Sequence, residues 1–525
     1  MAKLNVFFPL LLVFYEGGAQ VEWRFHLRFT YFKYTNILTY KRTYFYFFKG
    51  KSSSKKRRKK PNQQQIRAKE RKSRRKHFKP LAGNQKEVGM AILRQIHKTI
   101  HHYWPDLFDR FAGLSDPRKG AEYSISEIIT AALCMFLLKR QSRNQMNLLR
   151  RESRYFRKNY RKLFRFDLPD MDIVEDVFRL LEAEELERLK AVLVRELIRK
   201  KVLCKHRLYE GSIIIAVDGF HHSSYDADYC GECTWQTSSG GKTTWFHKAL
   251  EAKIVTASGL SLSVATEWIS NDGSQYDKQD CELKAFTRLA QKLKSYFPRM
   301  KICMLGDGLY PNQTVFSICR DNQWEYILTF KDGNLPSVWK EVELLRHCAM
   351  QHHKEEWASK DHLLKHEYSW INDIEYEKIN LHWIECLETK VEVKTGECRE
   401  GRFVHLCSLP PSRELASMIS RTGRLRWKIE NEGFNIQKNH GYNLGHKFSR
   451  VSFNALKNYY QCMQIAHMIN QLTVHSRRIQ ELIEKDPKIT LKFIWEQLTG
   501  LLSFTQPPIE DIENRSRRRC QIILV

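Results

Sequence analysis

The spacing of apolar positions changes along the chain. Residues 90–206 repeat apolar positions at helical intervals, as in 124–140 and 172–201, and predict a mainly helical region. Beyond residue 212 short β-branched runs take over. Between 213 and 330 they predict three strands, a helix, a strand, a helix and a strand. Such an order is typical of an α/β fold.

Acidic residues follow two of the predicted strands. Ile213–Val217 reads as a buried strand ending at Asp218, and Lys301–Leu305 reads as another ending at Gly306 and Asp307. Further strands are predicted at 246–257, 260–268 and 326–330, with helices at 280–296 and 312–322. A glycine follows each aspartate, and we expect it to let the backbone turn away from the carboxylate.

The remainder of the chain divides by its pattern. Residues 341–408 predict a β-rich insertion, and a long helix containing Arg421–Gln437 is expected after it. We assign 207–340 and 409–450 to one α/β core. Residues 451–525 form a helical region in which 452–485 are apolar enough to be core or a self-association surface.

Charge singles out the first residues of the chain. The formal net charge is +29, and residues 1–80 hold 22 Lys and Arg against three Glu, a net +19. Residues 1–89 therefore predict a disordered tail, aromatic before residue 50 and basic after it. The tail is either a phosphate-binding arm or translated flanking sequence with the true start near Met90, and we favour the second interpretation.

Basic residues also alternate with aromatic ones at 139–165. Such helices suit docking on a DNA backbone, and they equally suit a solvated helix face. The composition does not separate these two interpretations.

The cysteines and the motifs of the chain limit the cellular compartments and the cofactors that we expect for it. Thirteen cysteines without a framework spacing indicate a reducing cytosol, so a cytoplasmic, nucleoid-associated protein is expected. No apolar run approaches the roughly 20 residues of a transmembrane helix, so no membrane partner is expected. The absence of a GxxxxGK[ST] loop predicts no nucleotide cofactor.

Carboxylates at the ends of neighbouring strands suggest a chemistry. Divalent ions about 4 Å apart can activate a nucleophile and neutralise a leaving oxyanion in phosphodiester cleavage. Mg²⁺ takes oxygen ligands, and the carboxyl ends of parallel strands bring such ligands together. Asp218 and Asp307 fit this requirement, although both could be ordinary turn residues.

A third acid is expected on the later helix. Arg426 and Glu430 are four residues apart and share a helix face. Taken alone, the pair is best explained as a surface ion pair worth about 0.3–0.5 kcal/mol.

The segments AVDGF, KQDCE (278–282), LGDGLY and RWKIENEGFNIQKNHGYNLGH (426–446) carry a family resemblance. Over roughly residues 110–475 the chain resembles IS4-like DDE transposases, which have an RNase H-like catalytic core. The resemblance implies that Asp218, Asp307 and Glu430 are catalytic and bind two Mg²⁺ or Mn²⁺ ions. It also implies DNA-binding roles for Arg426 and Lys438.

The family signature is usually written Tyr, two residues, Arg, three residues, Glu, six residues, Lys. Arg426 and Glu430 match it. Gly423 stands where Tyr is expected and Gln437 where Lys is expected, with Lys438 one position further on. We assign the phosphate-gripping role to Lys438.

The resemblance implies a mechanism and partners. The expected enzyme binds the ends of its insertion sequence, cleaves phosphodiester bonds and joins 3′-hydroxyl ends to target DNA. Double-stranded DNA is the expected partner, with a homodimer in the DNA complex. The alternatives are a catalytically inactive DNA-binding remnant or captured transposase, and an RNase H-like nuclease without end specificity.

Several other residues are weighed beside the acids. Cys230 and Cys233 have zinc-ligand spacing, and His247 and Cys281 could complete such a site, but loop cysteines are the favoured interpretation. His221 and His222 could contact a phosphate or be solvent-exposed loop residues. Glu267 and Asp280 are further acids near the core. Glu432 is an alternative to Glu430 as the third acid, but it does not share the helix face of Arg426.

Overall fold

The computed structural model describes residues 83–208, 211–269, 281–359, 361–486, 489–516 and 522–524. The predicted tail lies outside the described residues as far as residue 82, and so does the spare acid Asp280. Helix α2 (Gly83–Tyr103) covers the last part of the predicted tail. Among the described residues, no helix has both the length and the apolar character needed to cross a bilayer.

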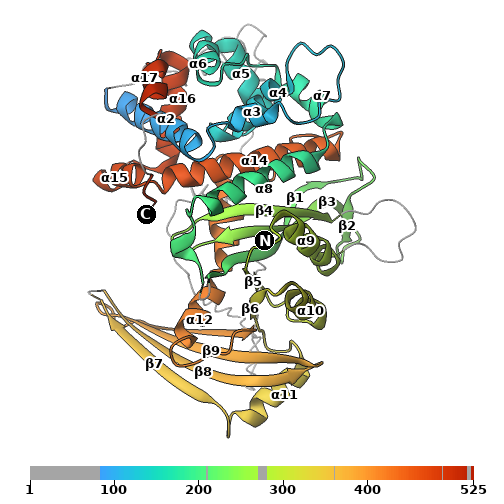
Figure 1. Ribbon diagram of the computed structural model, residues 1–525, viewed down its shortest axis with the longest axis vertical. Coiled ribbons are helices and arrows are strands. Elements are labelled where there is room, and N and C mark those ends of the chain that lie inside the picture. The colour runs from blue at the N-terminus through green and yellow to red at the C-terminus, as the bar shows by residue number, and fades with distance from the viewer. Residues whose placement is uncertain are drawn as a thin grey trace, which may run out of the picture. The chain divides into compact units, whose positions relative to one another are not determined.

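Helices from both ends of the described chain pack together (Figure 1). α2 contacts α16, and the long helix α14 contacts α4, α7 and α8. The helices before the sheet are α2, α3 (Leu107–Phe111), α4 (Ile125–Leu137), α5 (Arg143–Glu152), α6 (Arg154–Phe164), α7 (Met171–Leu180), α8 (Ala183–Arg199) and the short η1 (Cys204–His206). Those after it are α14 (Phe453–Val474), α15 (Arg477–Lys485), α16 (Leu491–Phe504) and α17 (Ile509–Ser516).

Local sequence explains where α4 begins. The Ser124 side chain accepts the Glu127 N–H, and the Glu127 carboxylate accepts the Ser124 N–H at 2.8 Å. This reciprocal cap satisfies two backbone donors at the helix start. Almost every residue of α4 is buried, and so is almost all of α14. Of the two interpretations of 452–485, the structure therefore supports core.

The central sheet has the order β4-β3-β1-β5-β6, with β2 also paired to β3. Its strands are β1 (Ile213–Tyr225), β2 (Thr234–Thr237), β3 (Thr243–Val255), β4 (Ser261–Ile269), β5 (Ile302–Gly306) and β6 (Glu325–Thr329). β3 is antiparallel to β1 and β4, whereas β1, β5 and β6 run parallel. This is the strand order of an RNase H-like sheet, and the predicted fold class is confirmed.

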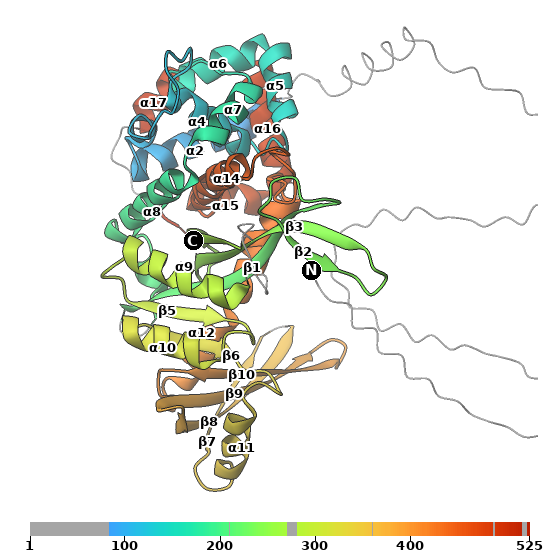
Figure 2. The same ribbon diagram turned by 90° about the vertical axis from the view of Figure 1, so that its right-hand side faces the viewer.

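Helices cover both faces of this sheet (Figures 1 and 2). α9 (Glu282–Tyr296) packs on β3 and β4, and α10 (Gln313–Asn322) packs on β6. On β1, Gly219 faces the α9 residue Glu282, whereas the Phe220 ring stacks on Tyr460 of α14 at 5.2 Å. Because successive residues of a strand face opposite ways, α9 and α14 lie on opposite faces of β1.

The predicted β-rich insertion continues the same sheet. Its strands β7 (Gln351–Ala358), β8 (His362–Tyr376), β9 (Ile379–Glu392) and β10 (Cys398–Cys407) form an antiparallel meander. β10 pairs with β6 from Cys407↔Ile327 to His405↔Thr329, so ten strands form one sheet. α11 (Pro336–Leu345) precedes the meander and contacts β8, and α12 (Ala416–Arg424) packs on β6, β8, β9 and β10.

Two local expectations were wrong. β1 does not end at Asp218; its pairing with β3 continues to Tyr225, because the β1–β3 hairpin extends beyond the end of β5. The segment Arg421–Gln437 is not one α-helix. After α12 the chain turns, forms the π-helical η3 (Ile429–Asn435) and continues into the short helix α13 (Ile436–Asn439). Single π-helical turns within helices often occur at functional sites.

Candidate active site

Asp218 and Asp307 lie across from each other on neighbouring parallel strands. β1 and β5 pair in register from Ile213↔Ile302 to Ala216↔Leu305. Since this register advances one residue at a time, Asp218 comes opposite Asp307 two positions further on. Both side chains are partly exposed, at 23% and 31%. The strand pattern therefore brings these acids to the carboxyl end of β5.

Turn contacts fix the Asp307 carboxylate. Its Oδ1 accepts the Leu309 N–H at 2.9 Å, and its Oδ2 lies 3.4 Å from the Lys331 Nζ. Leu309 belongs to the turn that links β5 to α10, whereas Lys331 follows β6. Tyr310, in the same turn, has a buried hydroxyl with no hydrogen-bond partner among the described atoms. Burial raises the pKa of Tyr310, and the nearby Glu282, Asp218 and Asp307 raise it further.

Glu430 reaches this region through Arg426. The Arg426 Nη1 donates to the Glu430 Oε1 at 2.6 Å and lies 3.7 Å from the Asp218 Oδ2. Arg426 is buried, whereas Glu430 is about half exposed. η3, which carries Glu430, packs on β1, β3 and β4. The guanidinium thus lies between an acid of the sheet and an acid of the π-helix.

Glu432, the rival acid, points elsewhere. Its Oε1 accepts from the Lys428 Nζ at 2.5 Å, and its side chain lies beside Gly259. The other spare acid, Glu267, is bound by Arg288 and by Lys292. Neither residue contacts the group around Asp218.

A fourth acid, Glu282, lies over Gly219, the residue next to Asp218. A Cβ atom on Gly219 would stand 2.5 Å from the Glu282 Oε1, so only glycine leaves room for this carboxylate. Glu282 begins α9 and pairs with the Lys248 Nζ at 2.5 Å. Sequence reasoning missed it because only the docking of α9 on β1 reveals this position; its place in the KQDCE segment was the available signal.

The electrostatics of Asp218 reflect this crowding. Burial raises its pKa to about 7, the nearby Arg426 opposes the shift, and Glu430, Asp307 and Glu282 add to it. Each of these acids is therefore close enough to Asp218 to act on its charge. A site with this excess of negative charge is suited to a cation.

The donor set fits hard divalent ions, which prefer carboxylate oxygens. The carboxylates themselves are more widely spaced than the ligands of a closed metal site. Among the described residues, the one group of three or more ligand atoms within 4.8 Å of one another is Cys230, Cys233 and His247, not the carboxylates. Glu430 is instead held by Arg426.

The departures from the family signature have structural causes. A Cβ atom on Gly423 would lie 2.5 Å from the His405 Nε2, so His405 fills the space of the expected Tyr. Gln437 is fully buried and donates to the Gln464 Oε1 at 2.8 Å. Lys438 is exposed on α13. Burial lowers the pKa of His221 most, and the positive charges of Lys248 and Lys438 lower it further. Lys438 can therefore reach a solvent-borne anion, and Gln437 cannot.

The two histidines after Asp218 are not solvent-exposed loop residues. His221 stacks on Phe246 with ring centroids 4.4 Å apart. His222 is buried, and burial lowers its pKa to about 3. A buried, neutral His222 is not available to a phosphate.

The basic helix α6 turns Phe156 and Tyr160 inward, whereas Tyr155 is exposed. Phe156 and Tyr160 are buried, and Asn159 donates to the carbonyl oxygens of Leu502 and Thr505. The outward positions are basic: Arg154, Arg157, Lys158, Arg161 and Lys162 are exposed. Arg161 pairs with Asp167. Phe156 and Tyr160 thus anchor the helix, and a basic face is left to solvent.

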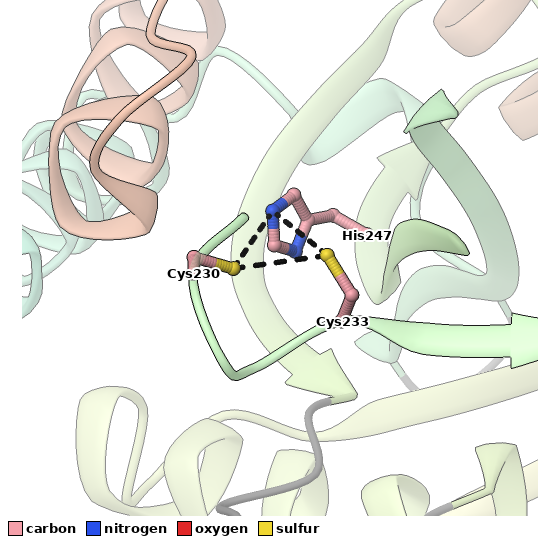
Figure 3. A group of neighbouring side chains, drawn as sticks. All are labelled: Cys230, Cys233 and His247. Carbon is pink, nitrogen blue, oxygen red and sulfur yellow. Dashed lines mark hydrogen bonds between the residues drawn. The ribbon is translucent and has the colours of Figure 1, made fainter. Parts of the chain in front are cut away.

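Two cysteines and a histidine form a compact group beside the sheet (Figure 3). The Cys230 Sγ lies 3.7 Å from the Cys233 Sγ and 3.6 Å from the His247 Nε2. Cys281, the other ligand weighed from sequence, is exposed and does not belong to the group.

Comparison with known proteins gives a fold-level likeness. No known family profile matches the chain, and no curated protein matches its sequence. A solved structure that it resembles is described as "Cryo-EM structure of piggyBac transposase synaptic complex with hairpin DNA". The TM-score is 0.36 at 9% sequence identity, over 81% of this chain and 85% of that chain. At such a TM-score, the fold assignment rests on the strand order itself.

Proposed function

We propose that this protein is an IS4-like DDE transposase that cleaves phosphodiester bonds at the ends of its insertion sequence and joins 3′-hydroxyl ends to target DNA. The observation that carries the proposal is the parallel pairing of β1 and β5 up to Ala216↔Leu305, two residues before Asp218 and Asp307, with Arg426 joining Asp218 to Glu430. Acids from three separate segments are thus neighbours near the carboxyl end of β5, and metal-dependent phosphodiester chemistry would need them to draw closer around the ions.

Asp218, Asp307 and Glu430 are the proposed ligands of two Mg²⁺ or Mn²⁺ ions. Bound by these carboxylates, such ions supply positive charge to the attacking and leaving oxygens of the phosphodiester. Arg426 orients Glu430 and keeps a buried guanidinium beside Asp218. We expect Glu430 to exchange its bond to Arg426 for a closer approach to the aspartates when DNA is bound.

DNA is the proposed partner, and two surfaces suit its backbone. Lys438 is exposed on α13, and its charge acts on His221 of β1. The exposed basic side chains of α6 form a second surface. Both would contact phosphates and set orientation rather than read base sequence. A homodimer that pairs two element ends, acting at the bacterial nucleoid in the cytoplasm, completes the proposal.

The test is cleavage of a duplex that carries the inverted repeats flanking the gene, in the presence of Mg²⁺ or Mn²⁺. Asp307→Asn and Glu430→Gln should each abolish nicking and leave end binding in place. Glu432→Gln is the matched control, since Glu432 lies on the same π-helix but pairs with Lys428. Retained nicking in Asp307→Asn would refute the assignment.

Gly423 and Gln437 favour one alternative, a DNA-binding remnant without catalysis. Neither position can hold its signature residue without displacing buried neighbours. A remnant would bind end DNA and never nick it, whatever the metal. An RNase H-like nuclease would cut scrambled ends as readily as cognate ones, so comparing the two substrates separates it from a transposase.

A further inference from the structure

Cys230 and Cys233 are brought together by a tight turn. Gly231 adopts a φ of +74°, a conformation that side-chain-bearing residues rarely take, and no atom lies within 4 Å of a Cβ built there. The Asp228 Oδ1 accepts the N–H groups of Cys230 at 3.2 Å and Gly231 at 2.9 Å. The turn is thus held by the Asp228 side chain, and it brings the two sulfurs within 3.7 Å of each other.

The distances match a tetrahedral metal site. With Zn–S of about 2.3 Å and Zn–N of about 2.05 Å, tetrahedral angles place two sulfurs about 3.8 Å apart and a sulfur about 3.6 Å from a nitrogen. Here the two Sγ atoms are 3.7 Å apart, and the His247 Nε2 lies 3.6 Å from Cys230 and 3.8 Å from Cys233. A disulfide would need its sulfurs about 2.05 Å apart.

His247 is held in place for this contact. It lies on β3 with its ring stacked on Phe453, the first residue of α14, at 3.9 Å and an interplanar angle of 6°. The same end of α14 reaches the cysteine turn, since the Lys457 Nζ lies 3.8 Å from the Glu232 Oε2. Cys233 and His247 are both buried, at 2% and 3% exposed. The group therefore lies between the sheet and α14, with Cys230 facing the loop.

We propose that Cys230, Cys233 and His247 bind a structural Zn²⁺ ion, and that Asp228, whose carboxylate lies outside this three-residue group, turns toward the ion to supply the fourth ligand. Two sulfurs and a nitrogen in tetrahedral arrangement select zinc over Mg²⁺, which takes oxygen ligands. Asp228 is chosen because its Oδ1 lies 3.8 Å from the Cys230 Sγ and is oriented by two backbone donors. A structural zinc site needs four ligands, and carboxylate oxygen is an accepted one.

The ion would fasten the loop between β1 and β2 to β3. β1 pairs with β3 from Ile215 to Tyr225, and Asp218 lies near the start of this paired stretch. The zinc site would therefore anchor the opposite end of the two strands that support the candidate active site. The proposal does not depend on the chemistry of the carboxylates, because a transposase, a remnant and a nuclease would all fold around the same ion.

The first test is the metal content of the full-length chain, purified without added zinc and measured by inductively coupled plasma mass spectrometry. About one zinc per chain is expected for the wild type and for Cys281→Ser, and none for the double variant Cys230→Ser/Cys233→Ser. Cys281 is the matched control, as an exposed cysteine outside the group. Wild-type chain without zinc, with Cys230 and Cys233 joined in a disulfide, would overturn the proposal.

The second test uses only the wild-type chain, so its result does not depend on whether the cysteine variants fold. Wild-type chain is stripped with a chelator and reloaded with Co²⁺, which should give a thiolate-to-cobalt charge-transfer band and tetrahedral ligand-field absorption. Stripping should lower the thermal unfolding midpoint by about 5 °C or more, with recovery on adding Zn²⁺ but not Mg²⁺. No charge-transfer band, or recovery with Mg²⁺ alone, would contradict a thiolate site.

Asp228→Asn tests the fourth ligand. Loss of its carboxylate should weaken zinc binding at least about tenfold and change the Co²⁺ ligand-field spectrum, while Cys230, Cys233 and His247 keep the ion bound. Unchanged affinity and spectrum would show that solvent, not Asp228, completes the coordination.

Discussion

The Nη1 atom of Arg426 lies 2.6 Å from the Oε1 atom of Glu430, one turn further along the chain. The same nitrogen is 3.7 Å from the Asp218 Oδ2, so one buried guanidinium serves two acids. Arg426→Gln should therefore lower the nicking rate by more than the roughly 0.5 kcal/mol of a surface ion pair would allow. We expect a loss of about 100-fold, the equivalent of about 2.7 kcal/mol.

Measurement of nicking against Mg²⁺ concentration tests the role of Arg426. If Arg426 only stabilises the fold, the unfolding midpoint will fall and the metal dependence will stay unchanged. Arg421→Gln is the control, since Arg421 is exposed on α12 and pairs with Glu355. If Arg426→Gln and Arg421→Gln lose the same nicking rate, Arg426 contributes no more than an exposed arginine on α12.

Gly423→Ala should destabilise the protein despite the better helix propensity of alanine. The added methyl group would meet the His405 Nε2 at 2.5 Å and the Ile327 Cγ2 at 2.9 Å. Overpacking of this kind costs about 1–3 kcal/mol. Thermal unfolding should show the loss, with Gly113→Ala as the control, because its nearest contact is 3.5 Å away. Adding His405→Ala should recover part of the loss if the clash is its cause.

Lys253→Met should stabilise the protein more at pH 7 than at pH 10. Burial lowers the pKa of Lys253 to about 8, with Glu251 opposing and Lys190 adding to the shift. Between about pH 8 and 10.5 the unfolded chain carries a proton that the folded chain does not, so the free energy of unfolding rises with pH across that window. Below pH 8 the cost of burying the charge is fully present.

Lys253 donates to the Gln464 Oε1 at 3.2 Å and lies 5.1 Å from the centroid of the Phe434 ring, so the variant also loses those contacts. Both contacts are strongest when Lys253 is charged, so their loss at pH 7 opposes the gain, and a larger gain at pH 7 than at pH 10 would show that the cost of burying the charge exceeds them. Lys284→Met, at an exposed position on α9, is the control. A midpoint gain independent of pH would contradict the prediction.

Gly219→Ala and Glu282→Gln should impair the same function. The new methyl group would displace the Glu282 carboxylate, which lies 2.5 Å from the position of that Cβ. Each variant should slow nicking about tenfold, a loss of about 1.4 kcal/mol. The double variant should be no slower than either single one, since both remove the same contact. If the losses of nicking rate add in the double variant, Gly219 and Glu282 act independently and the prediction is wrong.

Lys438→Ala should weaken DNA binding equally for cognate and scrambled ends. One lost phosphate contact reduces the slope of log affinity against log salt by about 1. Gln437→Lys should not restore the signature. It places an ammonium group in the buried contacts to Gln464 and His467, and should lower the unfolding midpoint instead.

The sequence was most informative where a local pattern carries the geometry. Asp218 comes directly after the apolar run Ile213–Val217 and Asp307 directly after the apolar strand β5, and buried apolar strands of that kind pair in parallel at the centre of an α/β sheet. The α/β class followed from the same pattern and the RNase H-like core from the family resemblance, and the strand order confirms both. The catalytic roles of Asp218, Asp307 and Glu430 stay a prediction.

Contacts between distant segments could not be obtained from the sequence. Glu282 joins the site only because α9 docks over Gly219, and His405 excludes a side chain at 423 only because β10 pairs with β6. The group of Cys230, Cys233 and His247 shows the same limit. The sequence offered His247 and Cys281 together as two further ligands, and only the fold places the His247 Nε2 beside both sulfurs and leaves Cys281 outside the group.

The pairing of β10 with β6 also sets a mechanical property of the molecule. Backbone hydrogen bonds run without a break from β7, at the far edge, to β5, which leads into Asp307. Neighbouring strands of a sheet are tied together by backbone hydrogen bonds. We therefore expect the meander to move together with β5 and Asp307 rather than to swing as a separate body.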